Sequence, residues 1–227
     1  MSRTPWRVGG AQRQGRREVQ ADAFAVTGDR ATGRIAVAVT DGIGDTADAA
    51  DAAHLAAEEA AGATLVATPE VACARARDKL AASSITADAS IVAALFDPDH
   101  SRIRIAWAGI CRAYALTTGG ELQRATYDHT LGERIREHST HRGPLRMYDR
   151  KLTRTVARHE FVTTSLPAET TTAVLLCTDG VSQSVDERTI TTALRCADPN
   201  DGAELLASAA GINGADNATA LVLRREK

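Results

Sequence analysis

Residues 34–42 read RIAVAVTDG, an apolar run of strand length that ends in an Asp-Gly pair. Residues 22–28, DAFAVTG, form a similar run before it, and the turn-forming GDRATG joins the two. Apolar runs bounded by Gly and Asp are typical of strands, so we predict a β-hairpin. The same ending recurs in TTAVLLCTDG (171–180), and an aspartate precedes the apolar run NATALVLRRE (217–226). Acidic residues therefore lie at or beside the ends of four predicted strands: Asp22, Asp41, Asp179 and Asp216.

The remaining chain alternates between helical and strand-like segments. Its periodicity and start signals predict helices over 47–66 and 69–82, as an antiparallel pair, and over 186–195 and 201–211. A meander of four strands is predicted over 89–96, 102–109, 111–117 and 121–126, and one helix over 129–143 within a polar, basic stretch. No repeat or linker divides the chain, which indicates one α+β domain.

Composition excludes several classes of function. The 27 basic and 29 acidic residues give a net charge of −2, which argues against bulk nucleic-acid binding. No stretch approaches the roughly 18 apolar residues of a membrane span, and residues 1–18 lack the apolar centre of a secretory signal, so we expect a soluble, cytoplasmic protein. The cysteines are far apart and are expected to be buried free thiols: Cys73, Cys111, Cys177 and Cys196.

The four aspartates at strand ends indicate a metal centre. Carboxylates gathered at one sheet rim repel one another unless a hard divalent cation such as Mg²⁺ or Mn²⁺ neutralises them. Two such ions would activate a water for attack on a phosphoryl group. Asp-Gly is also a common turn, and Asp a common helix cap, so the residues alone leave a purely structural role open.

Read in order, the segments resemble the metal-dependent protein phosphatases of type 2C, as a divergent, bacterial-like member. The matching stretches, in chain order, are RREVQADAF (16–24), VAVTDGIGD (37–45), DASIVAALF (88–96), GICRAYAL (109–116), Asp128-His129-Thr130, Leu152-Thr153-Arg154, LLCTDGVSQSV (175–185) and ADNATALVL (215–223). The resemblance covers roughly residues 10–225 in unbroken order.

This resemblance implies a four-layer α-β-β-α sandwich: two antiparallel sheets flanked by helices, as a single domain over 1–227 with a flexible start at 1–10. It implies hydrolysis of phosphoserine and phosphothreonine in proteins with two Mn²⁺ or Mg²⁺ ions. The implied metal ligands are Asp22, Asp41, the Gly42 carbonyl, Asp179 and Asp216. Arg17 would bind the phosphate, and Arg17, Asp41 and Asp179 form the catalytic set, while Asn217 would orient its neighbour Asp216.

The sequence departs from the family pattern at several positions. Ala21 replaces a Glu, and Ile110 replaces an Asp, which predicts loss of a third metal site. Ile43 replaces a His and Asp45 replaces a Gly, and Asp88 begins the stretch that replaces Gly-Thr-Thr. Asp45 or Asp88 could compensate for a lost carboxylate. One alternative is therefore a weak or inactive pseudophosphatase that binds a phosphoprotein or a kinase. Another is a hydrolase of small phosphorylated metabolites.

The expected partners are a phosphorylated protein substrate and a serine/threonine kinase or its targets, with no nucleic acid and no membrane, and the expected state is a monomer. His129, His138 and His141 are expected at the surface, in a solvated charged loop whose arginines could also steer a phosphorylated or acidic partner. The Ala-rich stretch 47–66 is expected to pack on its own sheet. Trp107 and Tyr114 are expected to be core residues in adjacent strands.

Overall fold

The apolar runs of the sequence form two antiparallel sheets in a computed structural model that describes residues 6–138 and 145–226. One sheet has the strand order β1 (Trp6–Arg13), β10 (Ala218–Arg225), β9 (Thr171–Cys177), β6 (Arg112–Thr117) and β7 (Leu122–Arg124). The other has the order β2 (Asp22–Asp29), β3 (Arg34–Gly42), β4 (Ala89–Phe96), β5 (Arg102–Ala108) and β8 (Val162–Pro167).

The two sheets pack face to face over a dry core. Side chains of β3, β4 and β5, such as Val39, Val92 and Trp107, meet Leu176 of β9 and Leu221 of β10 in one buried cluster. Because aromatic residues are only 4% of the chain, aliphatic side chains supply most of the apolar area that stabilises this contact.

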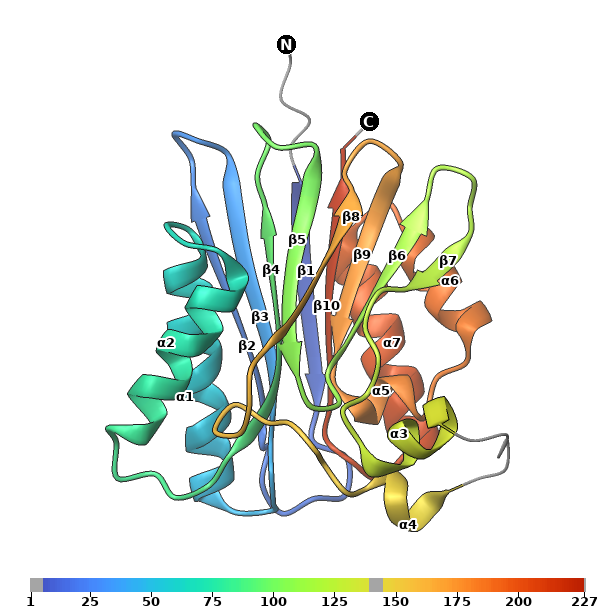
Figure 1. Cartoon of the computed structure of the whole chain (residues 1–227). Helices are drawn as coiled ribbons and strands as arrows, with labels where there is room; N and C mark the ends of the chain where they lie inside the picture. The colour runs from blue at the N-terminus through green and yellow to red at the C-terminus, as the bar shows by residue number, and fades with distance from the viewer. Residues whose placement is uncertain (1–5, 139–144, 227) are drawn as a thin grey trace.

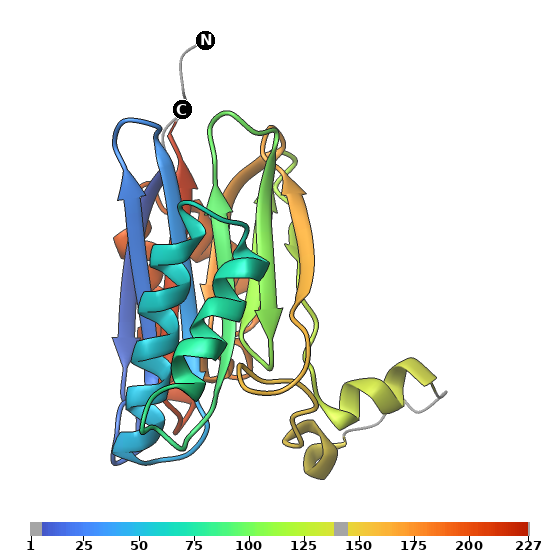
Figure 2. The same cartoon turned by 60° about the vertical axis from the view of Figure 1, so that its left-hand side comes forward.

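Helices cover both outer faces, which gives the predicted four layers (Figures 1 and 2). Helices α1 (Ala47–Thr64) and α2 (Pro69–Ala81) pack on the sheet of β3, and α6 (Glu187–Arg195) and α7 (Pro199–Asn213) on the sheet of β10. The threonines at 46 and 68 cap the first two helices, and alanines of α1 bury its inner face. The predicted α+β sandwich, the helix pair and the packing of the Ala-rich stretch on its own sheet are confirmed.

Three shorter helices lie at one end of the molecule. Helix α5 (Asp179–Ser182) directly follows β9, while α3 (Leu131–His138) and α4 (Arg146–Asp149) contact each other below the sheets in Figure 1. The helix predicted over 129–143 is thus shorter at its start, and its last residues lie outside the described ranges. No helix in the described ranges is both long enough and apolar enough to cross a membrane.

The predicted four-strand meander is wrong. Strands β4 and β5 pair in one sheet, but β6 and β7 belong to the other, so the chain changes sheets between Ala108 and Arg112. Gly109 makes this crossing with a φ of 100°, and a Cβ there would collide with the Ser90 hydroxyl. Trp107 and Tyr114 are buried as predicted, although they lie in different sheets.

The expected flexible start is also wrong for residues 6–10, which belong to β1; residues 1–5 lie outside the described ranges. Strand β1 pairs along its whole length with β10. Gly9 and Gly10 carry no side chain because α7 and Phe24 pack directly on the strand. Among the cysteines, Cys73, Cys111 and Cys177 are buried and Cys196 is partly exposed, all as free thiols.

Candidate metal and phosphate site

The strand register brings the aspartates to one rim, at the lower edge of Figure 1. Asp22 opens β2 and is the Cα partner of Asp41 in β3, which in turn pairs with Ser90 of β4. Asp179 follows β9 directly, and Asp216 lies just before β10. The rim surrounds a cavity of about 300 Å³ lined by Arg17, Asp41, Gly42, Ile43, Gly44, Ser90, Ile110, Asp149, Arg150, Leu152, Asp179, Gln183, Asp216 and Asn217.

Asp22 is the innermost of the four carboxylates and does not line this cavity. It is 2% exposed, and its Oδ2 accepts hydrogen bonds from the hydroxyls of Thr178 at 2.7 Å and Thr219 at 2.9 Å. Burial raises the pKa of Asp22 to about 7, against the lowering effect of the two hydroxyls. Asp22 therefore joins the two sheets directly behind the rim.

Asp41 and Asp179 line the cavity together with Asp149 and Asp216, and both have raised pKa values. Burial first, and then repulsion from Asp179, raises the pKa of Asp41 well above its ordinary value. Burial and repulsion from Asp216 also raise the pKa of Asp179, to about 6, and Gln183 donates a hydrogen bond to its Oδ2 at 2.9 Å. Two carboxylates that resist ionisation in one cavity are a typical property of a site that holds cations.

Asp216 is held by Arg17 in this structure. The guanidinium donates from Nε to Oδ1 and from Nη2 to Oδ2, each at 2.8 Å, and this pairing raises the pKa of Arg17. Asn217 accepts a hydrogen bond from the Ala21 amide at 2.8 Å and donates one to the Gln14 carbonyl at 2.7 Å. Asn217 thereby fixes the segment that carries Arg17.

The donor chemistry of the rim fits a divalent cation. Its groups are hard oxygens, the Gly42 backbone lies so close to Ala49 that a Cβ would collide, and the buried Ser90 Oγ has no hydrogen-bond partner among the described residues. Within residues 6–138 and 145–226, however, no three His, Cys, Asp or Glu side chains converge closely enough to hold a metal. In this structure Arg17 is paired with both carboxylate oxygens of Asp216, and Thr178 and Thr219 donate to Oδ2 of Asp22. An ion would have to displace Arg17 to recruit Asp216.

The departures from the family pattern have structural explanations. Asp45 accepts hydrogen bonds from the amides of Glu18 and Val19, and Asp88 accepts from the Thr155 hydroxyl and two amides, so both carboxylates hold loops. Ile110 presents an apolar side chain to the cavity. Neither Asp45 nor Asp88 therefore replaces the carboxylates that the family pattern has at positions 21 and 110.

Sequence reasoning missed three of the residues that line the cavity. Ser90 and the pair Asp149 and Arg150 all line it. Asp149 accepts two hydrogen bonds from Arg136, at 2.6 and 2.8 Å, which fixes α4 against α3. The strand pattern could have pointed to Ser90, since it pairs with Asp41, but nothing local places α4 at the rim.

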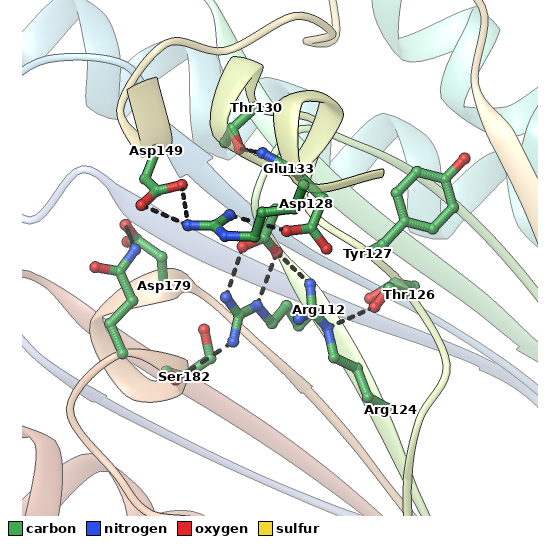
Figure 3. A network of polar contacts seen from close by, with 12 residues as sticks. Arg112, Arg124, Thr126, Tyr127, Asp128, Thr130, Glu133, Asp149, Asp179 and Ser182 are labelled. Atoms are coloured by element: carbon green, nitrogen blue, oxygen red, sulfur yellow. Dashed lines mark hydrogen bonds and ion pairs between the residues drawn. The ribbon is translucent and has the colours of Figure 1, made fainter. Parts of the chain in front are cut away.

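A second polar network lies beside Asp179 (Figure 3). Asp128 accepts from Arg112 at 2.6 and 2.8 Å and from Arg124 at 2.8 Å. Arg112 also donates to the carbonyl of Ser182, the last residue of α5, at 3.4 Å, and its charge opposes the rise in the pKa of Asp179. This network holds the end of α5 and contributes to the electric field around Asp179.

The expected surface position of His129 is wrong. His129 is 4% exposed and stacks on Trp107 with the ring planes 2° apart. It is buried because the Gly109 amide donates to its Nδ1 at 3.1 Å, while its own amide donates to the Gly109 carbonyl at 2.9 Å. His138 is exposed, as expected, and His141 lies outside the described ranges.

The raised pKa of Asp22 predicts an unusual pH dependence of stability in metal-free protein. The folded state holds a proton on Asp22 up to about pH 7, whereas the unfolded chain releases it near its ordinary value of 3.8. Stability therefore falls as pH rises between these values and stays low above them. We expect Asp22→Asn to be more stable than wild type by about 2–4 kcal/mol at pH 8, with the gap closing towards pH 5.

Urea unfolding in a chelator, compared between the two proteins at each pH, measures this gap. Burial lowers the pKa of His129 to about 4, so its protonation destabilises both proteins on acidification. Because this contribution is the same in wild type and variant, it cancels in the comparison. A gap that does not change with pH would contradict the prediction.

No family model and no curated protein matches the sequence. Solved structures do match over nearly the whole chain. The catalytic domain of the serine/threonine phosphatase PstP, in complex with two manganese ions, is 22% identical with a TM-score of 0.80, covering 98% of this chain and 99% of that one. Stp1 from Staphylococcus aureus is 17% identical with a TM-score of 0.82, covering 99% and 96%. The PPM phosphatase MsPP from Mycobacterium smegmatis, in complex with cacodylate, is 22% identical with a TM-score of 0.75, covering 97% and 98%. This chain therefore has the fold of the bacterial PPM-type, or type 2C, serine/threonine phosphatases, in a divergent form.

Proposed function

We propose that this protein is a metal-dependent phosphatase that hydrolyses phosphoserine and phosphothreonine in proteins. The observation that carries the proposal is the meeting, in one cavity, of two partly buried carboxylates with raised pKa values and one guanidinium: Asp41, Asp179 and Arg17. The metal-bound PstP structure, which shares the fold, supports the same chemistry.

The proposed ligands of two Mn²⁺ or Mg²⁺ ions are Asp22, Asp41, the Gly42 carbonyl, Asp179 and Asp216. When bound, such ions polarise the phosphoryl group and lower the pKa of a water so that it can attack in line. Asp41 would act from the end of β3, where the strand fixes its backbone. Asp22 would act through Oδ1, since the threonines use Oδ2.

Arg17 would bind the substrate phosphate once its guanidinium has left Asp216. Its planar fork, which accommodates the two oxygens of Asp216 here, is equally suited to two phosphate oxygens. Arg112 would keep Asp179 ionised by its positive charge. Because the proposed substrate is a phosphorylated protein, we propose that a serine/threonine kinase supplies the phosphate group. We also propose that the chain acts as a monomer.

A pseudophosphatase is the second candidate, and the Arg17–Asp216 pair favours it. In that pair the charge of Asp216, a proposed metal ligand, is neutralised by Arg17. Ala21 and Ile110 supply no carboxylate that could replace it. Such a protein would bind a phosphoprotein or a kinase without turnover.

Manganese titration separates the two candidates. We expect calorimetry to show two Mn²⁺ sites, and we expect hydrolysis of p-nitrophenyl phosphate and of a phosphothreonine peptide to need Mn²⁺ and to stop with chelator. A preference for the small ester over the peptide would indicate a metabolite hydrolase. Folded protein without turnover at millimolar Mn²⁺ would overturn the enzyme proposal and leave the binding module.

A further inference from the structure

A second cavity, of about 400 Å³, lies next to the proposed catalytic one. Leu152 lines the catalytic cavity, and the next two residues, Thr153 and Arg154, line the second. The Asp128 network stands between them: Figure 3 shows Asp179 on one side of it and Tyr127, which lines the second cavity, on the other. An extended chain could therefore enter both cavities at once.

His129 gives this cavity a fixed hydrogen-bond donor. Because Nδ1 accepts from the Gly109 amide, the proton of the neutral ring is on Nε2. That Nε2 is buried and has no partner among the described residues. Stacking on Trp107 and the edge-on ring of Tyr127 prevent the imidazole from turning away. A buried N–H without an acceptor is costly, so a ligand that supplies one is favoured.

The charges around the cavity favour an anionic acceptor. Arg154 lines the same cavity as His129 and supplies a positive charge there, while its Nη1 donates to the Glu160 carbonyl at 2.6 Å. Exposed Arg134 adds a second positive charge. Of the acidic lining residues, Asp128 is paired with two arginines and Glu133 with Arg136, while exposed Glu137 offsets the charge of exposed Arg134.

We propose that this cavity is a subsite for an acidic side chain of the phosphoprotein substrate, whose carboxylate accepts a hydrogen bond from His129 Nε2 and pairs with Arg154. The inference rests on the proposed phosphatase function and adds a preference for acidic residues near the phosphorylated one. Consecutive residues, 152 to 154, line the two cavities in turn, and this adjacency favours a peptide over an independent small anion.

Phosphothreonine peptides with one glutamate moved through the flanking positions, each matched by a glutamine peptide, test this subsite. We expect one position at which glutamate lowers KM about ten-fold relative to glutamine, the effect of one charge-assisted hydrogen bond. His129→Asn keeps an acceptor near Gly109 and removes the Nε2 donor, and Arg154→Gln removes the charge. Both variants should lose the preference, whereas Arg188→Gln, on the exposed face of α6, should keep it.

Hydrolysis of p-nitrophenyl phosphate separates failure of the subsite from failure of the function. If wild type hydrolyses this ester but treats every glutamate and glutamine pair alike, or if both variants retain the preference with unchanged melting temperatures, the subsite is wrong. If wild type hydrolyses nothing, fluorescence anisotropy of the labelled peptides measures binding directly. Tighter binding of glutamate peptides that Arg154→Gln abolishes would then support the subsite, and equal binding would overturn it.

Discussion

Replacing Asp41 with asparagine is expected to lower manganese-dependent hydrolysis by at least about a thousand-fold, because metal ions contribute several kcal/mol to such reactions. Asp41 faces the cavity from the end of β3. Burial and repulsion from Asp179 raise its pKa well above the ordinary value of an aspartate. The amide keeps the shape of the side chain and removes the charge. The loss should therefore lie in kcat and in manganese affinity, with the fold intact.

Calorimetry with Mn²⁺ and turnover of p-nitrophenyl phosphate measure the two effects. Asp51→Asn is the matched control, since Asp51 is an exposed aspartate of α1 and should leave both unchanged. An Asp41→Asn protein that binds manganese and turns over like wild type would remove Asp41 from the metal site.

Replacing Arg17 with alanine is expected to have two opposite effects. The kcat/KM for a phosphothreonine peptide should fall about 100- to 1,000-fold, because two charge-assisted hydrogen bonds to phosphate are lost. Manganese should bind more tightly, because Asp216 no longer has to exchange the guanidinium that holds it at 2.8 Å. A residue that merely stabilised the loop would weaken both properties together.

Arg16→Gln is the control for this pair of effects, since Arg16 is the exposed neighbour in the same loop. Arg17→Lys should recover only part of kcat/KM, because an ammonium cannot form the planar fork. If Arg17→Ala left peptide hydrolysis unchanged, the phosphate-binding role would be refuted.

Local patterns predicted the central strands and the helix pair well. Strands β3 and β4 are long apolar runs with turn residues at their ends, and α1 has capping residues and buried alanines at helical spacing. The change of sheet at Gly109 was not predictable from local patterns, because it depends on which sheet offers a strand for β6 to pair with. Strand β1 was missed because Gly9 and Gly10 have low strand propensity, and only contact with α7 and Phe24 explains them.

In the candidate site, too, the sequence predicted only the residues that a local pattern marks. Asp41 and Asp179 were found because a strand end and a glycine mark them locally. Ser90, Asp149 and the buried state of His129 were missed, since cross-strand register, the docking of α4 and the stacking on Trp107 are long-range contacts. The metal-binding roles of Asp22, Asp41, Gly42, Asp179 and Asp216 and the phosphate-binding role of Arg17 stay predictions.

The pairing of β1 with β10 has a consequence for how the chain folds during synthesis. Strand β10 lies between β1 and β9, so neither can complete its ladder until the far end of the sequence has been made. Strands β2, β3 and β4, with α1, contact one another within the first half and can assemble earlier. Closing the first sheet requires contacts between residues distant in sequence, which is slow. A nascent chain stalled before β10 would leave the edge of β9 open to wrong partners.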